Sequence, residues 1–462
     1  MDTVAQMRKF VEPASVALIG VSRSSEPMSG LKFDILRNLL DYGYQGRIYP
    51  VNPHANEILG IQAYPSIGEV AEDIDLAVIN LPRSLVPGAI KDCGRKGISS
   101  VVIVTQGFAD ADDEEGRQLQ REIDRLVKED KVRILGPNSL GTANAFINFS
   151  SSFVKIEMKR VPIGVICQTG VFMIGYPTLT LAGKSIDLGN GCDIDFADGL
   201  EYFEQDKDVK VIALHIEGVR DARRFLSVAN RVAHKKPIVA LKTGRSGLAA
   251  KAAQSHTGSL VGKDEIWEVA LKQSGIIRVE DVDELSDMVK VFSILPLMKG
   301  RKLGVVTHSG AFGVMSIDAC QTFGLELARL SPAAMKQISA ISPSWLAIGN
   351  PVDTWPAIMI ERHSPTEAIA EGICALINDV DAVLFMLNAA CQQWRDEHCQ
   401  LMTELANSYP DKPLVSHSWG PMADEIAEKV EKAGKTITLS SPDRAIRALS
   451  HLADYSHFLG CF

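Results

Sequence analysis

The sequence predicts an α/β protein built from three successive doubly wound domains, a Rossmann-like domain followed by two flavodoxin-like domains. Short β-branched runs alternate with amphipathic helical patterns, and this alternation is typical of βαβ units and parallel sheets. The chain has 462 residues, which is too long for one hydrophobic core. Two stretches near its end also echo two stretches of its middle part, which indicates a duplicated domain. We expect domains at residues 1–150, 151–297 and 300–462.

The composition is ordinary for a globular protein, with 46% hydrophobic and 23% charged residues. A net charge of -9 counts against nucleic-acid binding and leaves any anion site to local basic residues. We see no signal-peptide core at the N-terminus and no apolar run long enough to span a bilayer. The eight cysteines form no CxxC pair, which argues against a disulfide or zinc framework. We therefore expect a cytoplasmic protein that has no metal of its own and binds neither nucleic acid nor a membrane.

Five apolar runs in the first segment predict the strands of a parallel sheet, each followed by a loop and a helix. Ligands bind such sheets beyond the carboxyl ends of the strands. The first strand ends at Gly20, where the sequence matches the G-x-G-x-x-G dinucleotide fingerprint only in part. The second strand ends at Asn52 and not at the acidic residue that binds a nicotinamide ribose. Both features count against a nicotinamide-dependent oxidoreductase. The runs cover residues 16–20, 47–52, 75–81, 100–104 and 133–138.

The second segment repeats this alternation and places polar residues after its strands. Gly170 opens the helix that follows the first of these strands. A glycine leaves room at a helix N-terminus, where unpaired amides and the helix dipole favour an anion. Asn190 and Glu217 follow two other strands. The strands are predicted at residues 163–166, 185–188, 211–216, 237–241 and 276–279.

His256 is the most informative residue of the chain. It lies between hydroxyl residues in a Gly/Ala-rich stretch that contains Lys242, Arg245 and Lys251. A neutral imidazole nitrogen can attack phosphorus and form a covalent intermediate, and a carboxylate such as Glu217 can fix the tautomer that leaves this nitrogen free. A lone loop histidine is more often structural, so the rest of the chain has to decide between the two interpretations.

The third segment echoes the second in two places and in the same order. Residues 303–312 repeat the pattern of residues 163–172, which is a strand, a polar pair, a hydroxyl residue, a glycine, an apolar residue and a phenylalanine. Residues 349–353 likewise repeat residues 189–193. The duplication predicts a second helix N-terminus near Gly310 that corresponds to the one near Gly170.

These motifs resemble the alpha subunit of succinyl-CoA synthetase and the NDP-forming acyl-CoA synthetases over nearly the whole chain. Several residues depart from the pattern of the family, among them His308, Ser309, Ala311 and Phe312 in the turn before the expected second helix N-terminus. His54 stands where a Lys or Arg is common, Ser139 stands where a Cys is usual, and Cys167 replaces a Ser. The matching stretches are the Gly20 turn, 49–53, 81–82, 105–107, 136–138 and the phosphohistidine motif 255–260.

The resemblance implies a role for particular residues of this chain. The catalytic pair is His256 with Glu217, and substrate contacts fall to Asn190, Asn350 and Asp353. The phosphoryl group is expected at Gln168, Thr169 and Gly170 and at Ser309 and Gly310. CoA is expected at Gly20, Ser22, Arg23, Pro53, Leu81, Pro82, Thr105, Gln106, Gly107 and Asn138.

The resemblance further implies the alpha subunit of an ADP-forming acyl-CoA synthetase. Such an enzyme converts a carboxylic acid, CoA and ATP reversibly into acyl-CoA through an acyl phosphate and a phosphohistidine relay. We find no ATP-grasp pattern in the sequence, so ATP or ADP with Mg is expected on a separate beta subunit, in an α2β2 assembly. The alternative is a non-catalytic CoA-binding or acyl-CoA-binding regulator of the same fold. The sequence leaves the acid itself open.

Overall fold

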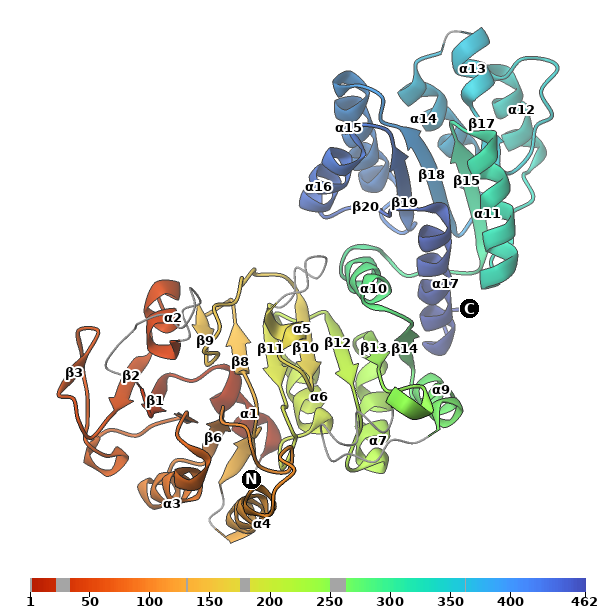
Figure 1. Cartoon of the computed structure of the whole chain (residues 1–462). Coiled ribbons are helices and arrows are strands. Elements are labelled where there is room, and N and C mark those ends of the chain that lie inside the picture. The colour runs from red at the N-terminus through yellow and green to blue at the C-terminus, as the bar shows by residue number, and fades with distance from the viewer. Residues whose placement is uncertain (1, 22–33, 130–131, 175–182, 250–262, 362) are drawn as a thin grey trace. The chain divides into compact units, whose positions relative to one another are not determined.

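The computed structural model describes residues 2–21, 34–129, 132–174, 183–249, 263–361 and 363–462. They form two compact units, Met1–Leu285 and Ser286–Phe462, and both units are α/β (Figure 1). No helix among the described residues is long and apolar enough to cross a membrane.

The first sheet of unit 1 is parallel and has the strand order β2-β1-β5-β6-β7. Its central strands are buried along their whole length, as expected for a sheet that is covered on both faces. The strands are β1 (Ser15–Ile19), β2 (Arg47–Val51), β5 (Leu76–Ile79), β6 (Ser100–Ile103) and β7 (Arg133–Leu135). Its helices are α1 (Thr3–Val11), α2 (Ile35–Tyr42), α3 (Val86–Lys96) and α4 (Glu114–Glu129).

The expectation of a helix after every strand of the first sheet is wrong at β2. A two-stranded hairpin, β3 (Glu57–Ile58) with β4 (Ile61–Gln62), follows there, and the short helix η1 (Ile67–Glu69) leads on to β5. Leu59 and Gly60 form the hairpin loop with positive φ values of 51° and 80°. Another short helix, η2 (Arg83–Leu85), precedes α3.

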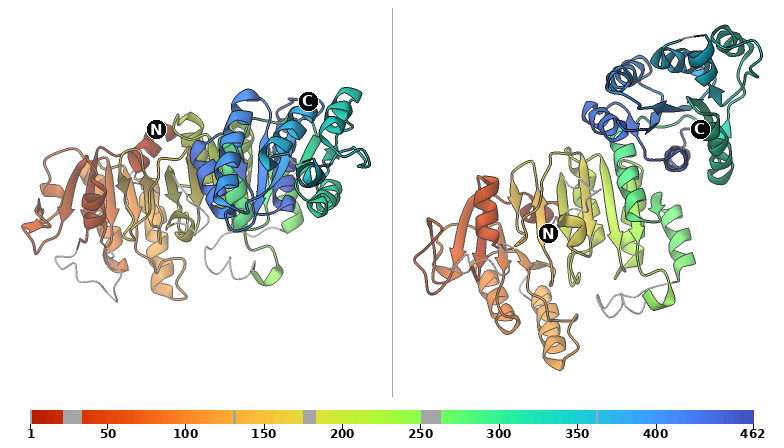
Figure 2. Two further views of the ribbon diagram at one scale, coloured as in Figure 1. Left: turned by 90° about the horizontal axis from the view of Figure 1, so that it is seen from above. Right: turned by 45° about the horizontal axis from the view of Figure 1, so that its top comes forward.

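The second sheet of unit 1 has the order β14-β13-β12-β10-β11-β8-β9. Strand β8 (Gly141–Asn144) pairs antiparallel with β11 (Lys184–Asp187), and β9 (Phe149–Ser150) pairs with β8. This sheet therefore begins within the segment that the sequence pattern groups with the first domain. Polar residues such as Thr142 and Asn144 hide the strand pattern of β8, although both are buried. The two views of Figure 2 show the strands of both sheets side by side within unit 1.

The remaining strands of the second sheet are parallel, as the sequence predicts. They are β10 (Ile163–Cys167), β12 (Val211–Ile216), β13 (Ile238–Lys242) and β14 (Ile276–Val279). Helix α5 (Val171–Ile174) follows β10, and the other helices are α6 (Phe196–Gln205), α7 (Ala222–Ala233) and α9 (Asp264–Gln273). The boundary between the two units falls within the next helix, α10 (Val282–Ile294).

The sheet of unit 2 has the order β16-β15-β18-β19-β20, and β17 also pairs with β15. Its strands are β15 (Lys302–Thr307), β16 (Glu326–Leu327), β17 (Val352–Asp353), β18 (Ala382–Asn388), β19 (Leu414–Trp419) and β20 (Ile437–Thr438). Its helices are α11 (Gly310–Phe323), α12 (Pro332–Ile341), α13 (Trp355–Ile360), α14 (Pro365–Leu376), α15 (Gln392–Ser408), α16 (Ala423–Ala433) and α17 (Pro442–Phe458).

Strand register shows how the two flavodoxin-like sheets correspond. Beside β10 runs one strand, β11, whose last residue Asp187 pairs with Cys167. Beside β15 run two short strands: β16 pairs with its start, and β17 pairs Asp353 with Thr307 at its end. Asp187 and Asp353 are therefore the corresponding residues, whereas the sequence echo had aligned Asp193 with Asp353. The chain between β16 and β17 contains α12. These additional residues are the reason why the sequence echo did not align Asp187 with Asp353.

Candidate functional site

The predicted CoA-binding residues that the structure describes lie at the carboxyl edge of the first sheet. Gly20 ends β1 with a φ of 95°, and a Cβ there would lie 2.2 Å from the backbone oxygen of Asn80. Only a glycine fits this turn. Pro53 is exposed in the turn after β2, where Asn52 donates a hydrogen bond to the backbone oxygen of Val21 (2.7 Å). Ser22 and Arg23 lie outside the described residues.

Hydrogen bonds join the next three turns of this edge into one row. Thr105 Oγ1 donates to the backbone oxygen of Leu81 (2.7 Å), and the amide of Asn138 donates to the backbone oxygen of Thr105 (3.0 Å). Asn138 has a φ of 58°. Pro82 begins the short helix η2, and Gln106 is exposed beside Thr105. Hydrogen bonds between their own loops thus bring together three of the residues that the resemblance assigns to CoA, Leu81, Thr105 and Asn138.

Asp110 connects the Gly107 turn to the second sheet. Its carboxylate accepts hydrogen bonds from the amides of Gly107 (3.0 Å) and Phe108 (2.9 Å) and from the side-chain amide of Asn190 (2.8 Å). Burial raises the pKa of Asp110, but these three hydrogen bonds outweigh it and hold the pKa below the usual value. Asn190, a predicted substrate contact, therefore uses one of its donors to link the two domains of unit 1.

Gln168 organises the predicted phosphoryl site of unit 1. Its Oε1 accepts hydrogen bonds from the amides of Glu217 (2.7 Å) and Gly218 (3.0 Å). The turn after β10 and the turn after β12 are thereby held together. Thr169 is half-buried, and Gly170 begins the turn into α5, where a Cβ would lie 2.4 Å from Leu140 Cδ1. The two turns present Gln168 and Glu217 at one edge, as the sequence predicts.

Asp187 is a buried carboxylate behind this turn. Its Oδ2 accepts a hydrogen bond from the amide of Leu140 (2.7 Å), and its Oδ1 accepts one from the amide of Gly189 (3.2 Å). Burial is the main cause that raises its pKa to about 6, and the charge of Glu217 adds to the effect. Cys167 lies opposite Asp187 and is fully buried, and burial raises the pKa of its thiol well above the usual value.

Lys242 is the last residue of β13 and contacts the backbone of Glu217. Its side chain is 1% exposed, its Nζ donates to the backbone oxygen of Glu217 (3.0 Å) and lies 5.3 Å from the ring centroid of Trp267. Burial lowers its pKa to about 8. The structure describes the chain up to Ala249 on this side, so His256 lies outside the described residues.

The corresponding turn of unit 2 has different neighbours. Ser309 precedes α11, and its amide donates to Thr307 Oγ1 (2.9 Å). A Cβ on Gly310 would lie 3.1 Å from Asp353 Oδ2, so the carboxylate faces the helix start as Asp187 faces Gly170. Asn350 uses both donors of its amide on the backbone oxygens of Leu303 (2.8 Å) and Ala328 (3.1 Å). This bonding favours a structural role for Asn350.

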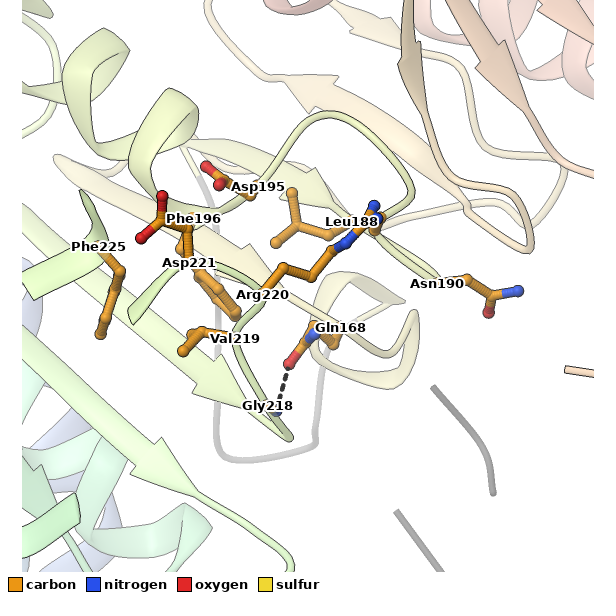
Figure 3. A pocket seen from close by; sticks show the side chains of 11 residues that line it. Gln168, Leu188, Asn190, Asp195, Phe196, Gly218, Val219, Arg220, Asp221 and Phe225 are labelled. Carbon is orange, nitrogen blue, oxygen red and sulfur yellow. Dashed lines mark hydrogen bonds between the residues drawn. The ribbon is translucent and has the colours of Figure 1, made fainter. Parts of the chain in front are cut away.

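A pocket opens beside the Gln168 turn of unit 1 (Figure 3). Its floor is apolar, and Arg220 reaches across it from the turn after β12 toward the turn after β11. The pocket is lined by Gln168, Leu188, Asn190, Gly191, Asp195, Phe196, Gly218, Val219, Arg220, Asp221 and Phe225. Within the described part of the chain, no group of three or more His, Cys, Asp and Glu side chains could hold a metal ion.

Two family models match the chain in the order that the fold shows. Residues 14–145 match a model described as a CoA binding domain, and residues 160–292 match one described as a succinyl-CoA ligase like flavodoxin domain. The fold and the site thus define a CoA-binding protein of the succinyl-CoA ligase type.

Named relatives narrow this class. The chain is 34% identical to the alpha subunit of the ADP-forming acetate–CoA ligase I of Pyrococcus furiosus, over 97% of this chain and 98% of that subunit. It is 36% identical to the ADP-forming acetate–CoA ligase of Methanocaldococcus jannaschii, over 98% of this chain. The chain belongs to the family of ADP-forming acetate–CoA ligases. It spans 63% of the length of the M. jannaschii ligase and 57% of that of ligase II of Archaeoglobus fulgidus.

Solved structures agree with this assignment. The chain is similar to an acetyl-coenzyme A synthetase 1 of Ca. Korarchaeum cryptofilum that was solved in complex with phosphate and ADP, with a TM-score of 0.85 and 30% identity. The similarity covers 98% of this chain and 97% of that one. These relatives are named as ligases and a synthetase, which gives no support to the regulatory or oxidoreductase alternatives.

The structure adds site residues that sequence reasoning missed. Asp110, Asp187 and Leu140 hold the predicted turns in place, and Arg220 lines the pocket beside them. Asp187 could have been found from the sequence, because a charged residue at the end of a buried strand needs hydrogen-bond partners and is often part of a site. Asp110 and Arg220 lie in loops without a pattern, and only their contacts reveal them.

Proposed function

We propose that this chain is the CoA-binding and phosphohistidine-bearing part of an ADP-forming acyl-CoA synthetase. His256 carries the phosphoryl group, Glu217 orients its imidazole, and the ATP-grasp site with Mg lies on a separate beta subunit in an α2β2 assembly. The hydrogen bond from the backbone amide of Glu217 to Gln168 Oε1 supports the proposal, because it joins the turn expected to bind the phosphoryl group to the turn that carries Glu217. The relatives named as alpha subunits support a separate partner.

The reaction balances as three transfers in the synthetic direction. An imidazole nitrogen of His256 attacks the terminal phosphorus of ATP, and ADP leaves. A carboxylate oxygen of the acid then attacks the phosphorus of the phosphohistidine, which frees the imidazole and forms an acyl phosphate. The CoA thiolate attacks the acyl carbon, and inorganic phosphate leaves as the thioester forms. Positioning and charge neutralisation do most of this work, and the amides of the turn at Gly170 supply part of both.

CoA binding occupies the carboxyl edge of the first sheet. The turns at Gly20, Leu81, Thr105 and Asn138 line that edge, and their close backbone approach suits a phosphate-bearing ligand. The hydrogen bond from Asn190 to Asp110 connects this edge to the turn after β11, which is the turn expected to contact the acid substrate.

Phosphate labelling tests the proposal directly. The chain is mixed with its beta subunit and ATP labelled in the γ-phosphate, and acid-labile label on the chain is measured. We expect His256→Ala to abolish this label and His234→Ala, a change of an exposed histidine after α7, to leave it intact. Equal labelling of both variants would contradict the phosphohistidine assignment. Turnover of ATP, acid and CoA by the chain without a partner would contradict the separate subunit.

A further inference from the structure

Lys242 is a buried cation that the proposed reaction does not use. It is the last residue of β13, and its side chain is 1% exposed. Among the described residues, no carboxylate forms an ion pair with its Nζ. Burying an ammonium group is costly unless other polar groups compensate for the lost water. The groups around Lys242 therefore show what its charge stabilises.

The Nζ of Lys242 joins the two turns that follow β12 and β13. It donates hydrogen bonds to the backbone oxygen of Glu217 (3.0 Å) and to that of Thr243. Glu217 follows the end of β12, and Thr243 follows the end of β13. The ring of Trp267 in α9 lies with its centroid 5.3 Å from the Nζ and is itself only 8% exposed. A cation beside a buried indole is favourable, and the burial of both side chains keeps water away from the two hydrogen bonds.

His215 holds Thr243 from the opposite face of the sheet. Lys242 pairs with Ile216 in the register of β12 and β13, and side chains alternate along a strand, so His215 lies on the face opposite to Lys242. The Nε2 of His215 lies 3.1 Å from Thr243 Oγ1. The imidazole also stacks on the ring of Phe172 in α5, with 4.3 Å between the centroids. Thr243 is therefore held from both faces at the point where the chain leaves β13.

We propose that Lys242 is a positioning residue for phosphoryl transfer, because its ammonium group ties the backbone of Glu217 to that of Thr243. This inference rests on the proposed function, in which Glu217 orients the imidazole of His256. Phosphoryl transfer depends on positioning, and a displacement of about 1 Å can lower a rate about 100-fold. The tie sets the spacing between the turn that carries Glu217 and the start of the segment that leads to His256. Lys242 thus acts through these two turns and not on the reacting atoms.

The tie depends on the proton of Lys242. A protonated amine has three N–H donors and no lone pair, whereas a neutral amine has a lone pair that a backbone oxygen repels. Burial lowers the pKa of Lys242 to about 8, so the tie is complete at neutral pH and weakens as the pH rises through 8. His215 is neutral at this pH, because burial lowers its pKa to about 4. The charged groups on the elements around Lys242 are Glu217, Arg245, Asp264 and Arg278.

Phosphate labelling of the complex with the beta subunit, measured as a rate at several pH values, tests the role of Lys242. Lys242→Met removes the charge, Lys242→Arg keeps it at every pH used, and Lys272→Met is the control on the exposed side of α9. We expect Lys242→Met to lower the rate about tenfold or more at neutral pH, Lys242→Arg to restore part of it, and Lys272→Met to leave it unchanged. The rate of the unaltered chain should fall as the pH rises through about 8, and Lys242→Arg should lack this fall.

Four outcomes of this experiment would overturn the proposal. They are an unaltered rate in Lys242→Met, an equal loss in Lys272→Met, a Lys242→Arg variant no faster than Lys242→Met, and the same alkaline fall in Lys242→Arg as in the unaltered chain. A residue with only a structural role would not change the shape of the pH profile, so the last comparison separates positioning from stability.

Hydrogen exchange of the purified chain, followed by mass spectrometry, distinguishes this proposal from the proposed function. Lys242→Met should speed exchange in peptides from both tied turns, 216–220 and 242–249, and not in the reference strand 15–19. Faster exchange in the reference strand as well would show a general loss of structure and would overturn the tie. If both turns exchange faster while the unaltered chain takes no label from ATP, the tie stands and the synthetase assignment fails. If exchange is unchanged while the unaltered chain is labelled on His256, the tie fails and the synthetase assignment stands.

Discussion

The side chain of Gln168 holds the backbone of Glu217 at the carboxyl edge of the second sheet. Its Oε1 accepts the amide hydrogens of Glu217 at 2.7 Å and of Gly218 at 3.0 Å, and Gln168 is only 6% exposed. The resemblance assigns Gln168 to phosphate and Glu217 to the histidine. The contact shows that the placement of the second residue depends on the first.

Replacing Gln168 with leucine should therefore displace the turn that carries Glu217. We expect Gln168→Leu to lower the free energy of unfolding of unit 1 by about 1–3 kcal/mol, because the buried amide of Gly218 loses its acceptor. Phosphate labelling of the chain should fall as well. Gln168→Asn keeps an uncharged amide oxygen at this position and is the comparison variant in urea unfolding and labelling. Identical behaviour of the two variants would contradict the positioning role.

The contact between Asp110 and Asn190 predicts coupling between the CoA edge and the second sheet. A double-mutant cycle with Asp110→Ala and Asn190→Ala should give an interaction energy of about 0.5–3 kcal/mol in the free energy of unfolding. Asp110→Ala should also weaken CoA binding in calorimetry, because the amides of Gly107 and Phe108 lose their acceptor. Additive effects of the two changes would show that the hydrogen bond does not couple the domains.

The buried carboxyl of Asp187 predicts a pH dependence of stability with a definite sign. Burial raises its pKa from 3.8 to about 6, so the native state binds this proton more tightly than the unfolded state does. Stability from this group is present below about pH 4 and is lost as the pH rises through 6. Asp187→Asn should remove this component from the free energy of unfolding of unit 1, measured in urea between pH 4 and 7. Parallel curves for both proteins would contradict the raised pKa.

The two glycines at the helix starts should differ in their tolerance of a side chain. A Cβ on Gly170 would lie 2.4 Å from Leu140 Cδ1, whereas one on Gly310 would lie 3.1 Å from Asp353 Oδ2. We expect Gly170→Ala to cost about 1–3 kcal/mol in the free energy of unfolding, as overpacking does, and Gly310→Ala to cost less. Leu140→Ala removes the atom that the new Cβ would meet. Gly170→Ala should therefore lower the free energy of unfolding less in a Leu140→Ala background than in the unaltered chain. Full additivity of the two changes would argue against this contact.

Local pattern was sufficient for most of the fold. Buried apolar runs at 16–20 and 163–166 predict β1 and β10, because a strand buried on both faces needs a continuous run of apolar residues. The residues at strand ends, such as Gly20, Gln168 and Glu217, follow from the same runs, since parallel strands share one carboxyl edge. The family match also rests on such contiguous motifs.

The partners of these residues come only from the tertiary structure. Strand β8 carries polar residues that are buried between neighbours distant in sequence. In unit 2, β16 and β17 both pair with β15, whereas in unit 1 β11 alone pairs with the corresponding side of β10. Asp110, Asp187 and Arg220 act through loops brought together from different strands. The sequence by itself determined the apolar parallel strands and the residues at their ends, because both depend on local periodicity. The contacts that position those residues depend on long-range packing, which local periodicity does not record.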